Sequence, residues 1–137
     1  MVDKEIVQNR LLKLEEYIKD LEEYQNIKST KYKEDKLLKR FLERTLHLAI
    51  EACLDIGNHI ISDERLGLVD NNADVIRVLA ENDIIKAKEE NYIKMAKFRN
   101  IIVHDYATLD DEIMIKVLKE NLNDLKQFLI WIKEYIS

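Results

Sequence analysis

The sequence contains no proline and only two glycines among its 137 residues. These residue types normally interrupt regular structure and form tight turns. Their scarcity argues against a fold of many short strands, and it favours long helices with few breaks. We expect a single domain spanning residues 1–137, because a helical chain of this length can bury a core without disulfides or metals.

Cysteine and long apolar runs are also scarce. Cys53 is the one cysteine, so neither an internal disulfide nor a metal site built from cysteines can form. No stretch reaches about 18 uncharged apolar residues, and the N-terminal segment MVDKEIVQNR lacks the apolar core of an export signal. These absences predict a cytoplasmic protein that does not span a membrane, and a lone thiol fits that reducing setting.

The sequence also lacks an excess of basic residues. Acidic residues outnumber basic ones, and the formal net charge is −5. Proteins that bind nucleic acid mainly through its phosphates are usually basic, because neutralising phosphate drives that binding. The composition therefore argues against a general nucleic-acid coat protein, and any contact with RNA should be local.

Apolar residues recur every three or four positions along most of the chain, which is typical of amphipathic helices. No alternating strand pattern is present. We expect an all-α, up-and-down bundle of about four long helices and one short helix. Gly57 interrupts an apolar stripe and predicts close approach of another helix there. The expected helices span residues 4–24, 31–62, 73–80, 84–103 and 110–136.

Arg99 and His104 stand five residues apart in the segment KMAKFRNIIVHDY, residues 94–106. At about 100° per residue, an unbroken helix would separate their side chains by about 140°. Residues 101–103 are β-branched and have weak helix propensity, so the helix is expected to end here. His104 would then lie at a helix C-terminus, where the dipole favours the protonated ring. The flexible stem of Arg99 could reach the same pocket.

An arginine and a histidine together have the chemistry to cut RNA. The guanidinium offers a rigid fork of donors that matches phosphate oxygens. Imidazole, with an ordinary pKa of about 6.5, accepts or donates a proton near neutrality. Attack by a ribose 2′-OH requires a base and an acid, and a two-fold dimer would supply two histidines to one cleft without a metal. Because R-x(4)-H occurs often by chance, the spacing alone leaves a purely structural role open.

The segment RNIIVHDY resembles the R-x(4)-H-x-Y signature of HepT proteins in the HEPN superfamily. Arg99, His104 and Tyr106 occupy the signature positions, and Asn100 is the usual follower of the arginine. The segment ERTLHLAIEACLDIGNHI, residues 43–60, is similar to the long second helix of that family. The two landmarks occur in the expected order and together cover most of the chain.

This resemblance implies a helical homodimer in which the two R-x(4)-H motifs face each other. It implies a metal-independent ribonuclease toxin, without a cofactor, whose gene is paired with MntA, a minimal nucleotidyltransferase antitoxin. It also implies that the partner adds AMP to Tyr106, where a bulky anionic adduct would repel substrate phosphate. The alternative is a non-catalytic helical adaptor that binds a nucleotidyltransferase, but an adaptor has no need of all three motif side chains.

A run of basic residues precedes the motif. Between residues 86 and 99 five basic residues accompany two acidic ones. Lys94 and Lys97 are therefore candidates for a rim that guides RNA to the cleft. The alternative is an ordinary solvated helix face.

A polar stripe on the second long helix supplies further candidates. It includes Asp55 and His59, which lie in the family-like segment and are candidates for supporting the active site or the dimer contact. An exposed helix face is the alternative, and we expect no metal at this carboxylate–imidazole pair. His47 is flanked by apolar residues and is interpreted as a packed or surface histidine, and Cys53 as part of the core.

Overall fold

Residues 2–104 and 109–137 are described in the computed structural model, and in these ranges the chain forms six helices and no strand. The all-α prediction is confirmed, with four long helices and two short ones in place of one. The helices are α1 (Lys4–Glu22), α2 (Ser29–Glu34), α3 (Lys36–Glu64), α4 (Asn72–Glu81), α5 (Glu89–His104) and α6 (Asp111–Ile136).

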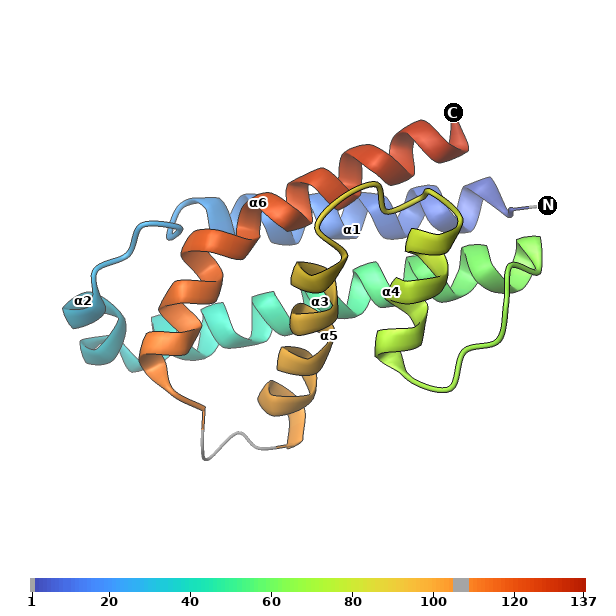
Figure 1. Ribbon diagram of the computed structural model, residues 1–137. Helices are drawn as coiled ribbons and strands as arrows, with labels where there is room; N and C mark the ends of the chain where they lie inside the picture. Colours follow the sequence, from blue (N-terminus) through green and yellow to red (C-terminus); the bar gives the residue numbers. More distant parts are fainter. Residues whose placement is uncertain (1, 105–108) are drawn as a thin grey trace.

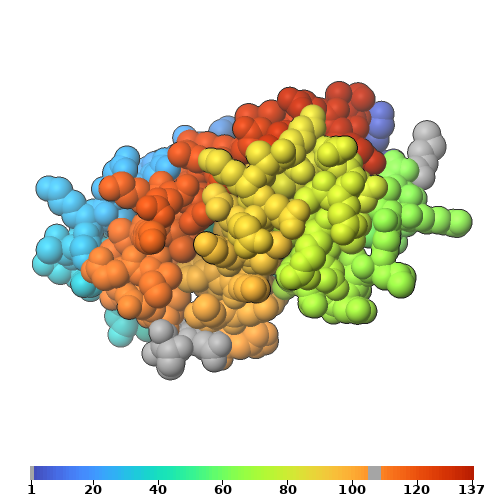
Figure 2. Space-filling view, viewed as in Figure 1, coloured from blue at the N-terminus to red at the C-terminus, as the bar shows by residue number. Residues whose placement is uncertain are grey.

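The longest helix, α3, is the central element of the bundle. α1 and α6 run along it, whereas α4 and α5 cross it steeply on one side, and both chain ends lie at the same end of the molecule (Figure 1). In the space-filling view of that side, α3 is largely hidden behind α4, α5 and α6 (Figure 2). Arg99 and His104 of the candidate motif are therefore carried by a helix that packs across the central helix.

Two of the expected helix boundaries were wrong. The helix predicted over residues 31–62 is divided at Asp35, whose extended backbone separates α2 from α3 and whose carboxylate accepts a hydrogen bond from the amide of Leu38 at 3.0 Å. A side-chain cap of this kind starts a new helix without proline or glycine.

The helix expected to start at Ile84 instead begins at Glu89. Ile84 and Ile85 are buried in the connecting segment, so they fill core space without being helical. The segment is flanked by Asp83 and Lys88, which both have a backbone φ of 57°. Apolar spacing alone cannot distinguish such a buried connection from a helical turn.

A polar cluster attaches the first half of α5 to α6. The hydroxyl of Tyr92 donates to the backbone carbonyl of Asp124 at 2.8 Å, and the ring of Tyr92 lies 5.8 Å from that of Trp131. The buried carboxylate of Asp124 accepts from the amides of Asn91 and Asn121 at 3.3 and 3.0 Å. Since buried polar groups are costly without partners, this cluster fixes where α5 lies on the bundle.

Gly57 is where α4 approaches α3, as its position in the apolar stripe predicted. A Cβ atom added at Gly57 would lie 2.7 Å from a methyl group of Val75 and 2.9 Å from one of Leu79. Both distances are shorter than a van der Waals contact, so the two helices need glycine here.

We predict that Gly57→Ala lowers the free energy of unfolding by about 1 kcal/mol. Overpacking destabilises a core by about 1–3 kcal/mol, whereas the higher helix propensity of alanine stabilises the helix by up to about 1 kcal/mol. Chemical denaturation measures this change. Asn58→Ala, at the exposed neighbouring position, is the matched control and should be neutral or stabilising. A Gly57→Ala protein more stable than the wild type would contradict the close approach.

Cys53 is buried, as expected of a core residue, and burial raises the pKa of its thiol. Across the described ranges, none of the helices combines the length and apolar character that membrane crossing requires.

Candidate active site

Arg99 points from α5 toward α3. Its Nε donates to Oε2 of Glu51 at 2.6 Å, and the two side chains are 21% and 36% exposed. One of its Nη atoms donates to Oδ1 of Asn100 at 3.2 Å. The guanidinium is therefore oriented by two acceptors, and it retains further N–H groups with which to bind an anion.

Two further side chains of α3, Arg44 and His47, lie next to the pair formed by Arg99 and Glu51. Arg44 donates from Nη1 to Nδ1 of His47 at 3.3 Å, so the proton of a neutral ring lies on Nε2. That Nε2 lies 3.6 Å from Oε2 of Glu51, which is an ion-pair distance but too long for a hydrogen bond. Burial lowers the pKa of His47 despite the opposing effect of Glu51, and this favours the neutral ring.

His104 occupies the last position of α5 and is exposed. Its predicted location at a helix C-terminus is confirmed, although residues 101–103 remain helical. Because the helix is unbroken from Arg99 to His104, the two side chains diverge by about 140°. Arg99 contacts Glu51 and Asn100. The helix break that was expected to bring Arg99 and His104 to one pocket is absent from the described residues.

Lys94 and Lys97 are both exposed and line a groove between α5 and α6, to which α6 contributes Lys116. Lys86 lies 3.5 Å from a carboxylate oxygen of Glu134, and Lys88 precedes the helix. The basic run therefore does not form one continuous rim. Lys94 and Lys97, which form no ion pair with any residue that the structure describes, lie on the side of α5 that faces α6.

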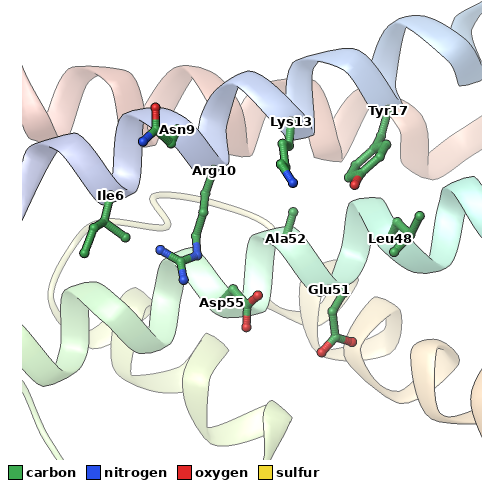
Figure 3. Close-up of a pocket in the computed structure, with 9 residues that line it drawn as sticks. All are labelled: Ile6, Asn9, Arg10, Lys13, Tyr17, Leu48, Glu51, Ala52 and Asp55. Carbon is green, nitrogen blue, oxygen red and sulfur yellow. The ribbon is translucent and has the colours of Figure 1, made fainter.

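Asp55 and His59 lie one helical turn apart on α3 but have different surroundings. Asp55 and Glu51 of α3 line a groove together with Arg10 and Lys13 of α1 (Figure 3). His59 lies two turns along the helix from Glu51, outside that groove, with its Nε2 3.5 Å from a carboxylate oxygen of Asp63. Asp55 thus lies near the partner of Arg99, whereas His59 does not.

Tyr106, the third residue of the motif, lies outside the described residues. In the described ranges no three side chains of the metal-binding types come together as a candidate metal site.

Glu51, His47 and Arg44 were the residues that the sequence interpretation missed as a group. Their spacing of three and four residues places them on one face of α3, and that pattern was visible in the sequence. The sequence did not indicate that Arg99 contacts this face, because Arg99 is 48 residues distant from Glu51 along the chain.

Comparison with known proteins identifies the class of this helical domain. The model of the ribonuclease HepT-like family matches residues 14–132. The chain is 32% identical to the mRNA nuclease HepT of Shewanella oneidensis over 94% of its own length and 97% of that protein. It is 24% identical to the tRNA nuclease HepT of Aphanizomenon flos-aquae, over 98% and 92% of the two lengths.

A solved structure gives the same result. It contains the tri-AMPylated Shewanella oneidensis HEPN toxin in complex with the MNT antitoxin, and its toxin fold matches this chain with a TM-score of 0.85. The identity is 32%, and the match covers 98% of this chain and 99% of that one. The chain belongs to the ribonuclease HepT-like family.

Proposed function

We propose that this protein is a metal-independent endoribonuclease that acts as the toxin of a toxin–antitoxin pair. The observation that carries the proposal is the intact R-x(4)-H-x-Y motif in a chain 32% identical to an mRNA nuclease along nearly its whole length. Arg99 binds the scissile phosphate, and His104 transfers protons. A nucleotidyltransferase of the MntA type is the proposed antitoxin, and Tyr106 the residue that it modifies with AMP.

In this mechanism a base takes the proton of the ribose 2′-OH, and the oxygen attacks the adjacent phosphorus. The bond from phosphorus to the 5′ oxygen breaks, and that oxygen receives a proton from an acid. The products are a 2′,3′-cyclic phosphate and a 5′-hydroxyl. Arg99 stabilises charge on the non-bridging oxygens with the N–H groups that Glu51 and Asn100 leave free.

The geometry of α5 favours a shared cleft between two copies. One protomer presents Arg99 and His104 on different faces of one helix, and the reaction requires both an acid and a base. Ile101 and Val103 lie next to His104 and are 40% and 38% exposed, so apolar surface remains uncovered beside the motif. A second copy of α5 packed there would bury this surface and bring two histidines together.

We predict that the wild-type protein is a homodimer and that Ile101→Lys converts it to monomers, because a charge would be buried in the contact. Light scattering at micromolar concentration measures the mass. Leu68→Lys, at a loop position that is 93% exposed, is the matched control and should remain dimeric. A wild-type monomer mass would contradict the shared cleft.

The test of the proposed function is incubation of purified protein with total RNA in the presence of a metal chelator. Cleavage to fragments with 2′,3′-cyclic phosphate ends is expected from the wild type, and none from His104→Ala. Absence of cleavage by the wild type under all conditions would overturn the proposal and favour the adaptor alternative.

Glu51 should act as a positioning residue for Arg99. We predict that Glu51→Ala lowers kcat about 10- to 100-fold, since a displaced phosphate-binding group costs that much. KM should not rise, because the substitution removes the carboxylate that competes with phosphate for the guanidinium of Arg99. Glu51→Gln keeps an oxygen that accepts from Nε and should recover much of the rate.

The control for Glu51 is Glu81→Ala, which removes an exposed carboxylate from the end of α4. Single-turnover cleavage of a defined RNA gives both constants. If Glu51→Gln were as slow as Glu51→Ala, the hydrogen bond to Nε would not be what positions Arg99.

A further inference from the structure

A groove lies where the last turn of α5 meets the first half of α3, on the side of α5 away from Lys94 and Lys97. α3 contributes polar and charged side chains to it, and α5 contributes an apolar wall. The lining residues are Arg40, Glu43, Arg44, His47, Ile102 and Val103. His104 follows Val103 directly, so the groove opens beside the candidate catalytic histidine.

Arg40 and Arg44 are one helical turn apart and exposed. Neither has a carboxylate within ion-pair distance in the described part of the chain, whereas the nearby Lys39 is paired with Asp111 at 2.7 Å. The polar contact of Arg44 is with the neutral ring of His47. Two guanidinium groups are thus available to an anion at this groove.

Glu43 is the acidic residue among those that line the groove, and its carboxylate carries at most one negative charge against the two positive charges of Arg40 and Arg44. The side chain is buried, with 3% of the residue exposed. Burial is the main influence on its carboxyl group and raises the pKa. The groove therefore carries a net positive charge in a protein whose overall charge is −5.

We propose that Arg40 and Arg44 bind the phosphate backbone of the RNA strand next to the scissile bond. This inference rests on the proposed ribonuclease function and extends it to a second substrate contact. Arginine pairs bind phosphate through paired N–H groups, and Arg40 and Arg44 lie one helical turn apart on exposed positions of α3. The strand would cross the exposed end of α5, with Arg40 and Arg44 on one flank and Lys94 and Lys97 on the other.

The test is RNA binding in the inactive His104→Ala background, measured by fluorescence anisotropy with single-stranded RNA over a series of salt concentrations. Arg40→Ala/Arg44→Ala should weaken binding equally across sequences and reduce the slope of log Kd against log salt by about 0.7 to 1.4, corresponding to one or two lost phosphate contacts. Arg40→Ala alone, which disturbs no described contact, should reduce it by about 0.7. Arg40→Lys/Arg44→Lys should retain most of the slope.

Lys4→Ala/Arg77→Ala is the control, because it removes the same charge from exposed positions on α1 and α4 that do not line the groove. An unchanged slope in the Arg40/Arg44 double variant, or an equal loss in the control, would overturn the inference. If the His104→Ala background bound no RNA at all, the failure would instead be that of the proposed function.

Discussion

His104→Ala and Arg99→Ala are each expected to reduce RNA cleavage by about 10²- to 10⁴-fold while the helical bundle stays folded. Loss of one proton-transfer group typically costs that factor, and removal of a donor that stabilises transition-state charge costs a similar one. His104 is exposed at the end of α5, so the substitution removes no core contact. Cleavage of a defined RNA, measured beside circular dichroism and thermal unfolding, tests both effects.

Arg99 needs a second variant, because Arg99→Ala also leaves Glu51 without its partner. Both side chains are partly exposed, so water screens the pair and its loss should cost less than about 1 kcal/mol of stability. Arg99→Lys keeps the positive charge but lacks the fork of donors that contacts Glu51 and phosphate at once. We expect Arg99→Lys to remain slow. Wild-type cleavage by either His104→Ala or Arg99→Ala would remove that residue from its assigned role.

Tyr106→Phe is expected to keep the fold and at least part of the activity, and to escape neutralisation by the antitoxin. Phenylalanine lacks the hydroxyl that would accept AMP. An AMP group on Tyr106, two residues past His104, would bring bulk and negative charge to the motif, and its phosphate could pair with Arg99, the cation that RNA requires. Co-expression with the nucleotidyltransferase, followed by intact-mass analysis and growth measurements, tests this.

Tyr135→Phe is the matched control for Tyr106, because Tyr135 is a 39% exposed tyrosine on α6 without a motif. This variant should still be modified and neutralised. AMP found only on another residue, or normal neutralisation of Tyr106→Phe, would contradict Tyr106 as the regulatory residue.

The secondary structure was largely predictable because local periodicity dictates it. The apolar stripe of α3 and the need for glycine at position 57 were both readable from spacing. The errors occurred where local pattern and structure disagree. Asp35 caps a new helix inside a continuous apolar pattern, and Ile84 is buried without being helical. In both places a side-chain cap or core packing decides the backbone, and neither leaves a periodic signal.

The sequence by itself determined the helical class, the approximate positions of the long helices and the identity of the motif residues, because these follow from composition, periodicity and a short pattern. Only the tertiary structure decided which residues pack against each helix face. The placement of α5 across α3 joins Arg99 to Glu51, 48 residues away, and leaves His104 exposed on another face. The same placement forms the groove that contains Arg40 and Arg44. Periodicity shows whether a helix face is polar or apolar. It does not show which residues contact that face when they are far apart in sequence, because those contacts depend on how the whole core packs.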